Sequence, residues 1–340
     1  MTNPDQPASD KAKSYEVLGI GTPIVDYLIH TSNEYVDSLE GCRGGSMLVD
    51  EKAFQKILND HSPDKVIAGG GAANTVKGLA RLGHACALVG KIGQDETGVQ
   101  FSQNIESHGI VPCLTSISTL PTGRSACLIT PDGERTMRTS IGAGAEMQET
   151  DLSPALFQNV RLVHIEGFLL TRKNLVEKAM QLAKEAGAAI SFDLSSREIV
   201  EEYKKPIVEL LTHYVDIAFA NEEETYILTG MAPERASALL RDLCSIAVIK
   251  AGSQGCWAAI KNQQAFHEAF QIEIIDTTGA GDLFASGFLH GFLTDKSLDE
   301  SLNYGARLAS EVIQTLGAEI PEPKWQEIRK SLEQSKKVTP

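Results

Sequence analysis

Patterns of buried strands and amphipathic helices alternate along most of this chain. Short apolar runs that are typical of buried strands occur at 16–21, 162–167 and 188–194. The segment 173–187 places apolar residues at helical spacing and ends in glycine, as an amphipathic helix often does. Strands that alternate with helices form parallel sheets that are covered on both faces. The sequence therefore predicts a three-layer α/β/α fold with a mostly parallel central sheet.

Two segments, 22–50 and 111–145, break this alternation. The second one contains strand-like runs and a "PDGE" turn. We predict that both segments form a small β-sheet lid on the larger layer. The chain has 340 residues, of which 42% are apolar, and α/β chains of this size can fold as one unit. We therefore expect a single domain over 14–340, preceded by a polar, disordered tail at 1–13.

The composition argues against several classes of protein. A formal net charge of −14 and the lack of a basic block make nucleic acid an unfavourable main ligand. The six cysteines include no C-x-x-C pair, so we expect reduced cysteines and no zinc site. The polar N-terminus has no signal-peptide core, and no apolar run approaches the roughly 20 residues of a membrane helix. These features predict a cytoplasmic protein.

The stretch "DTTGAGDLFASGF" (276–288) places glycines and one acid at the start of a predicted helix. Glycines let backbone N–H groups approach a ligand, and the free N–H groups of a helix start bind anions. Asp282 could accept a proton from a hydroxyl held beside such an anion, or it could simply cap the helix. The stretch matches neither a Walker loop nor G-x-G-x-x-G, because position 284 is Phe.

Two features nearer the N-terminus could contact a polar ligand. "GGGAANT" (69–75) is a glycine-rich entry to a helix with Asn74 one turn in, although a tight turn would also explain the glycines. Asp26 follows the first strand, where ligands of parallel sheets bind, and its carboxylate could hold sugar hydroxyls. A loop or capping role for Asp26 is the alternative.

Two features in the second half of the chain could contact phosphates. "NEEE" (221–224) begins a helix directly after a predicted strand, where acids are also favoured for electrostatic reasons. Asn221 and Glu224 could organise a magnesium–phosphate unit through waters, because Mg²⁺ dehydrates reluctantly. "IKAGSQG" (249–255) is a strand followed by two glycines, which could wrap a nucleotide or turn into the next strand.

In this order, the motifs resemble those of the PfkB family of carbohydrate and nucleoside kinases, which has the ribokinase-like fold. "DTTGAGDLFASGF" is similar to the C-terminal signature of that family, "GGGAANTVKGLARLG" to its N-terminal signature, and "NEEE" to its N-x-x-E motif. Two ordered signatures with N-x-x-E are more specific than any one of them. The resemblance spans about 16–316. It implies phosphoryl transfer from ATP with Mg²⁺.

The resemblance also implies roles for individual residues. Asp282 is the implied general base, and the implied anion hole consists of the N–H groups of Gly279, Ala280 and Gly281. The implied acceptor-binding residues are Asp26, Gly70, Gly71, Asn74 and Glu166. The implied nucleotide- and magnesium-binding residues are Asn221, Glu224, Lys250, Gly252, Gly255 and Asn303. Asp276 and Thr278 match positions that help to hold a monovalent cation in some relatives, which makes K⁺ a candidate cofactor, and Arg138 is a candidate phosphate contact.

The acceptor is harder to assign. About 44 residues separate Asp26 from Gly70. The length of this insert is similar to that in adenosine-kinase-like members, whereas ribokinases and fructokinases have a shorter insert. "GGSMLVD" (44–50) and "TPDGERTM" (130–137) resemble the same branch. We therefore expect an adenosine-like nucleoside as the acceptor, with a sugar kinase or a catalytically silent nucleoside or sugar sensor as alternatives. Gly71 and Lys250 depart from the residues common in the family, Ser and Thr respectively. We expect the protein to be a monomer or a homodimer.

Overall fold

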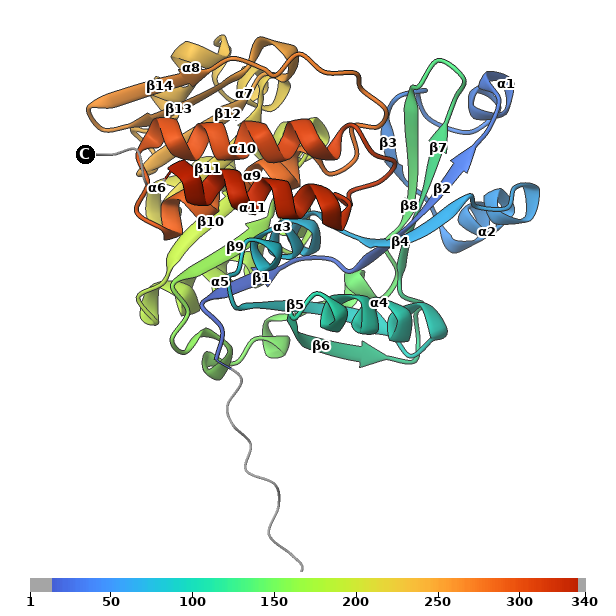
Figure 1. Cartoon of the computed structure of the whole chain (residues 1–340). Helices are drawn as coiled ribbons and strands as arrows, with labels where there is room; N and C mark the ends of the chain where they lie inside the picture. The colour runs from blue at the N-terminus through green and yellow to red at the C-terminus, as the bar shows by residue number, and fades with distance from the viewer. Residues whose placement is uncertain (1–13, 336–340) are drawn as a thin grey trace, which may run out of the picture.

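A nine-stranded sheet runs through the middle of the computed structural model, which describes residues 14–335 (Figure 1). In spatial order its strands are β14 (Gln263–His267), β13 (Cys256–Ile260), β12 (Ile246–Lys250), β11 (Ile217–Asn221), β10 (Ala189–Asp193), β9 (Leu162–Glu166), β1 (Val17–Ile20), β5 (Cys86–Gly93) and β6 (Val111–Ile117). Every pairing from β12 to β6 is parallel, whereas β13 and β14 add an antiparallel edge. The mostly parallel central sheet is confirmed, and the predicted tail at 1–13 lies outside the described residues.

The order of the strands creates a switch point beside β1. The chain first adds β5 and β6 on one side of β1 and then adds β9 to β12 on the other side. Connections from the two sides diverge there, and ligands of open α/β sheets bind outside the carboxyl ends of the strands near such a point. A ligand-binding site is therefore expected at this edge of the sheet.

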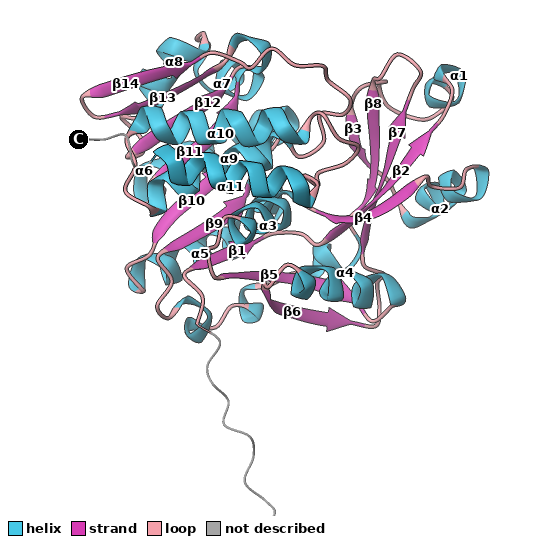
Figure 2. Ribbon diagram, viewed as in Figure 1, coloured by secondary structure: helices cyan, strands magenta, loops and turns pink. Residues whose placement is uncertain are grey.

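Helices cover both faces of the central sheet, as the alternating pattern predicts (Figure 2). One face carries α5 (Lys173–Glu185), α6 (Arg197–His213), α7 (Glu222–Thr229) and α8 (Pro233–Leu240). The other face carries α3 (Gly71–Arg81), α4 (Glu96–Ser107), α9 (Ala280–Leu293) and α10 (Leu298–Val312). α11 (Glu322–Ser335) packs outside α9 and α10. Fully buried side chains such as Phe192 and Phe288 each contribute roughly 1.5–3 kcal/mol, so the two apolar layers hold the sheet in place.

A second, smaller sheet stands beside the first (Figure 1). In spatial order its strands are β3 (Ser46–Leu48), β8 (Arg135–Ser140), β7 (Gly123–Ile129), β2 (Ile24–His30) and β4 (Lys65–Gly69). Two helices, α1 (Asn33–Asp37) and α2 (Glu51–Asp60), pack on one face of it through Val36, Phe54 and Ile57. The small sheet is therefore a structural layer with its own apolar cluster.

The segments predicted to form this sheet need two corrections. β4 belongs to it, although it lies outside both predicted segments, because it pairs with β2 before the chain enters α3. β6 begins the segment 111–145 but continues the central sheet as a parallel partner of β5. Hydrophobic pattern marks a strand without saying which neighbour it pairs with. In the described part of the chain, no helix is both long and apolar enough to cross a membrane.

Candidate active site

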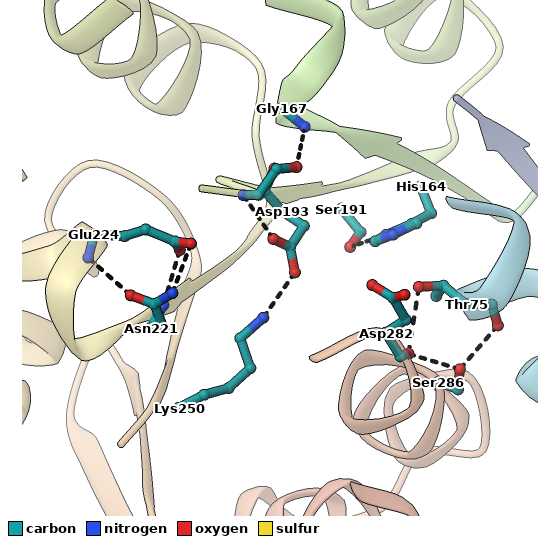
Figure 3. Close-up of polar contacts among 11 residues, drawn as sticks. Thr75, His164, Gly167, Ser191, Asp193, Asn221, Glu224, Lys250, Asp282 and Ser286 are labelled. Atoms are coloured by element: carbon teal, nitrogen blue, oxygen red, sulfur yellow. Dashed lines mark hydrogen bonds and ion pairs between the residues drawn. The ribbon is translucent and has the colours of Figure 1, made fainter. Parts of the chain in front are cut away.

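Four neighbouring strands of the central sheet end in polar residues at the same edge. Glu166 ends β9, Asp193 ends β10, Asn221 ends β11 and Lys250 ends β12. The parallel register brings the four residues together, because the carboxyl ends of parallel strands meet at one edge. They line a cavity of about 790 Å³, to which the start of α9 also contributes. Figure 3 shows Asp193, Asn221 and Lys250 there, with Asp282 of α9. This cavity is the candidate active site.

The start of α9 supplies backbone donors to the cavity. Gly279 is the N-cap residue and has left-handed backbone geometry, with φ of 74°. A side chain at 279 would be strained and would collide with Ala318, so glycine suits this helix start. The first N–H groups of a helix have no acceptor within it. Gly279, Ala280 and Gly281 all line the cavity, so these donors lie where an anion could be received.

Asp282 lies in the first turn of α9 without capping it. The helix has no side-chain cap bond, and the Oδ2 atom of Asp282 instead accepts a hydrogen bond of 2.9 Å from Nδ2 of Asn74 on α3. Burial raises the pKa of Asp282 to about 7. The Asn74 amide and the Lys250 ammonium act in the opposite direction, whereas Asp193 and Glu166 raise the pKa further. A buried carboxylate with a pKa near neutrality is suited to accept a proton.

Glu166 holds two loops together at the back of the cavity. Its Oε1 atom accepts a hydrogen bond of 2.7 Å from the Thr22 amide, and its Oε2 atom accepts one of 2.9 Å from the Ala72 amide. The second bond satisfies a donor at the start of α3. Glu166 therefore positions the glycine-rich entry to α3, including Gly71, beside the cavity. Its contact with the acceptor stays a prediction.

Asn221 and Glu224 form a closed pair at the start of α7. The Asn221 side chain accepts a hydrogen bond of 2.8 Å from the Glu224 amide, and Oε2 of Glu224 accepts one of 2.9 Å from the Asn221 amide. Nδ2 of Asn221 also donates to Oε1 of Glu224 over 2.8 Å (Figure 3). This capping box agrees with the electrostatic alternative for the motif. Burial and the neighbouring Asp193 raise the pKa of Glu224 to about 7, so the pair also carries a functional-site signature.

Lys250 and Asp193 form an ion pair inside the cavity. The Nζ atom of Lys250 lies 2.9 Å from Oδ2 of Asp193, and both side chains are mostly buried. Asp193 was not among the predicted site residues. Its signal was an acid near the end of the strand run "AAISFDL", which is similar to the position after a predicted strand that marked Asp26.

Comparison with known proteins assigns the family. A family model described as pfkB family carbohydrate kinase matches residues 45–325. The chain belongs to the pfkB family of carbohydrate kinases. Adenosine kinase of Schizophyllum commune is 25% identical, covering 93% of this chain and 99% of its own length. Ribokinase of Haemophilus influenzae is 27% identical, covering 79% and 88%.

Solved structures agree with this family assignment. Adenosine kinase from Sinorhizobium meliloti superposes with a TM-score of 0.87 at 29% identity, covering 95% of this chain and all 100% of the other. A probable sugar kinase from Rhizobium etli gives a TM-score of 0.88 at 29% identity, covering 94% and 98%. The protein is therefore a PfkB-type kinase, and the family generally uses ATP and Mg²⁺.

The cavity of this pfkB-family kinase is strongly acidic. Among the described residues that line it, seven side chains are acidic, whereas only Arg135 and Lys250 are positively charged, because burial lowers the pKa of His164 to about 4. A nucleoside triphosphate is itself a polyanion, so it needs compensating positive charge to enter such a site. The charge pattern agrees with the family's use of a divalent cation, and it makes each of the two basic side chains important.

Not every predicted site residue of the pfkB motifs lies in the cavity. Gly252 and Gly255 line it, whereas Asn303 does not; the Oδ1 atom of Asn303 lies 3.1 Å from Nε2 of His267. The suggested phosphate contact of Arg138 is wrong. This guanidinium is buried inside the small sheet and donates to the carbonyl oxygens of residues 42, 45 and 137.

Arg135 lines the cavity instead of Arg138, although the sequence did not indicate it as a site residue. Positions 135 and 138 are three residues apart on β8, so their side chains lie on opposite faces of the strand. The Arg135 guanidinium donates to Oγ1 of Thr278, and its Nη1 atom lies 3.6 Å from Oδ1 of Asp276. Because β8 belongs to the small sheet, this contact joins that sheet to the loop before α9.

Asp26, a predicted acceptor contact, lies on β2 and is buried behind Gly69. Burial raises the pKa of Asp26 to about 7, although the positive charges of Arg135 and Lys77 oppose the shift. Nearby, Oδ1 of Asn74 and Oγ1 of Thr22 are buried and have no hydrogen-bond partner among the described residues. Buried polar atoms are normally paired, so these two atoms suggest a place for a polar ligand.

The raised pKa of Asp282 predicts how stability depends on pH. The folded protein binds this proton more tightly than the unfolded chain, in which an Asp has a pKa of about 4. The carboxyl group therefore stabilises the fold at low pH, and this contribution is lost as the pH rises through about 7. We expect Asp282→Asn to have a higher Tm than the wild type at pH 8 and a smaller advantage at pH 5. Equal differences in thermal melts at both pH values would contradict the raised pKa.

Proposed function

We propose that this kinase transfers the γ-phosphoryl group of ATP to a primary hydroxyl group of an adenosine-like nucleoside. The observation that carries the proposal is the buried Asp282 carboxylate directly beside the donor N–H groups of α9. A relative named adenosine kinase, from S. commune, supports a nucleoside and aligns over almost the whole of both chains. A relative named 5-dehydro-2-deoxygluconokinase aligns just as fully, which keeps a sugar-type acceptor as the second candidate.

In the proposed reaction, Asp282 accepts the proton of the acceptor hydroxyl group as the oxygen attacks phosphorus. The N–H groups of Gly279, Ala280 and Gly281 stabilise the charge on the phosphoryl oxygens. Phosphoryl transfer needs positioning and charge stabilisation more than covalent help. Asn74 holds the Asp282 carboxylate, because its Nδ2 atom donates to Oδ2. The small sheet acts as a lid that excludes water, and the contact of Arg135 with Thr278 supports that role.

The nucleotide would occupy the part of the cavity near β12 and α10. Apolar side chains that line this part include Phe270, Ile274 and Ala309, and they could pack against a base. Gly252 and Gly255 would leave room for the sugar and phosphates. Among the described residues, no group of three His, Cys, Asp or Glu side chains forms a direct metal cage. The residues at 221–224 therefore fit Mg²⁺ held through water and ATP oxygens, where the ion would neutralise phosphate charge.

The acceptor would lie between Asp26 and Asn74. A buried carboxylate can accept two hydroxyl hydrogen bonds, as a ribose diol requires. The unpaired Oδ1 of Asn74 and Oγ1 of Thr22 provide further polar contacts. This arrangement also fits a free sugar, which is the second candidate because ribokinase and fructokinase are among the relatives.

An acceptor panel tests the proposal. Purified protein is supplied with MgATP and, one at a time, adenosine, other nucleosides, ribose and fructose, and ADP formation is measured. We expect the highest kcat/KM with adenosine or a close analogue. A higher value with ribose or fructose would establish the sugar kinase. Nucleoside binding by calorimetry without ADP formation from any acceptor would establish the silent sensor.

The predicted monovalent-cation site fits K⁺ poorly. Oδ1 of Asp276 already accepts bonds from N and Oγ1 of Thr278 (2.8 and 2.6 Å), and Oδ2 accepts one of 2.8 Å from the Gly317 amide. The Arg135 guanidinium lies beside the same oxygens, so a second cation there would be repelled.

We therefore expect little dependence on K⁺. Replacing KCl with choline chloride should change kcat less than about twofold, since Arg135 already supplies the charge. Arg135→Met should lower kcat about tenfold and should make it sensitive to K⁺. Thermal melts in the two salts give a readout apart from activity, and the Tm of the wild type should be the same in both. Strong activation or stabilisation of the wild type by K⁺ would contradict this assignment.

A further inference from the structure

Lys250 reaches across the end of one strand to a partner on the next. It ends β12 in register with Asn221 of β11, yet its ammonium group binds Asp193 of β10 over 2.9 Å. Figure 3 shows the side chain extending between the Asn221–Glu224 pair on one side and Asp282 on the other. Lys250 therefore stands in the middle of the groups to which we assign the chemistry.

The ammonium group also lies against the start of α9. A Cβ atom placed on Gly281 would be 3.0 Å from Nζ of Lys250, which is tighter than ordinary packing. Glycine at 281 therefore leaves room for this charge beside the backbone donors. A positive side chain and the N–H groups at the start of α9, of which that of Ala280 also donates to the Thr277 carbonyl over 3.2 Å, converge on the same part of the cavity, where both can bind an anion.

The surroundings keep Lys250 charged. Burial alone would lower its pKa, but the carboxylates of Asp193, Glu224 and Asp282 outweigh burial and raise it. A buried ion pair of this kind adds little to stability compared with apolar residues of similar volume. Stability is thus a weak reason for a lysine here, in a cavity where the only other positively charged lining side chain among the described residues is Arg135.

We propose that Lys250 is a catalytic residue whose ammonium group binds the γ-phosphoryl oxygens of ATP during transfer, and that Asp193 is its positioning residue. This inference rests on the proposed kinase function. The acceptor oxygen forms a bond to phosphorus while the bond from phosphorus to the bridging oxygen of ADP breaks. ADP leaves with that electron pair, Asp282 takes the hydroxyl proton, and Lys250 remains protonated as a hydrogen-bond donor throughout.

Nucleotide binding tests the inference without turnover. Calorimetry with Mg²⁺ compares ADP with a non-hydrolysable β,γ-imido analogue of ATP, for the wild type and for Lys250→Met. We expect the variant to lose about tenfold or more in affinity for the triphosphate and less than about threefold for ADP, because only the triphosphate carries a γ-phosphoryl group. Equal losses for both nucleotides, or no loss for either, would overturn the inference.

Two further variants separate a local role from damage to the fold. Lys250→Met removes the ion-pair partner of Asp193 and leaves a buried, uncompensated carboxylate. The double variant Lys250→Met/Asp193→Asn removes that charge as well and should show the same selective loss of affinity for the triphosphate. Lys261→Met removes an exposed lysine from the turn between β13 and β14 and should bind both nucleotides like the wild type. If the double variant distinguishes the two nucleotides as well as the wild type does, Lys250 does not contact the γ-phosphoryl group.

Kinetics supply an independent readout. Lys250 favours the ionised form of Asp282, so Lys250→Met should shift the acidic limb of kcat/KM to higher pH, and Lys250→Arg should restore much of that shift. Loss of a positioned charge should also lower kcat about 10²-fold. If the wild type is active and Lys250→Met has the same pH profile of kcat/KM, the role of Lys250 is rejected, whereas the proposed function stands. If the wild type transfers phosphate to no acceptor, the proposed function fails, and the nucleotide comparison still decides the role of Lys250.

Discussion

Replacing Asp282 with asparagine should lower kcat about 10³-fold, because a general base contributes roughly 10²–10⁴-fold to such a reaction. Asparagine has nearly the same shape and can still accept the hydrogen bond from Nδ2 of Asn74, but it cannot take a proton. The Kd values for nucleotide and acceptor should change little. Steady-state kinetics with calorimetry for each ligand make this measurement.

A matched control is available just after the same helix. Asp295 lies exposed just beyond the end of α9 in left-handed backbone geometry, which asparagine tolerates. Asp295→Asn should therefore keep the kcat of the wild type. In Asp282→Asn, a kcat within tenfold of the wild type would rule out the assignment of Asp282 as the base.

Replacing Asp26 with alanine should lower kcat/KM for the acceptor roughly 10²-fold, with little change in the Kd for ATP. The loss corresponds to about 3 kcal/mol, the upper range for hydrogen bonds to a charged group. The fold should tolerate the change, because burial makes the ionised Asp26 carboxylate unfavourable in the folded state. Kinetics at varied acceptor and fixed ATP provide the measurement.

Asp26→Asn tests whether charge or shape matters. Asparagine fills the same space but accepts fewer hydroxyl hydrogen bonds, so an intermediate loss is expected. Asp132→Asn, in the exposed turn between β7 and β8 of the same sheet, should leave acceptor kinetics unchanged. An unaltered acceptor KM and kcat in Asp26→Ala would remove Asp26 from the acceptor site.

Local pattern predicted the alternating elements well and failed where pattern alone is ambiguous. The helix predicted over 173–187 appears as α5, and the strand predicted over 188–194 appears as β10. α6 was not predicted, because Pro206 lies inside it and proline usually ends a helix. In the structure the helix is kinked at Tyr203, and the parts on both sides of the kink still pack on the sheet.

The site was predicted unevenly for a related reason. The motif at 276–288 contains its glycines and acid within a few residues, so the sequence could mark the proposed anion site and Asp282 together. Asp193 and Arg135 carry no such local pattern. They enter the cavity from β10 and β8, which belong to different sheets. Their role depends on distances across the fold, which periodicity does not contain.

The sequence by itself determined that this chain forms a parallel α/β sheet with a glycine-rich helix start that carries an acid, because those features depend on side-chain spacing and on glycine geometry. Only the tertiary structure decided which charges share the cavity. The parallel register aligned Asp193, Asn221 and Lys250, although long connections separate them in the chain. Strand alternation turned Arg135 toward the cavity and Arg138 away from it. Electrostatic interactions act through space, so the function of these residues follows from the fold that brings them within a few ångströms.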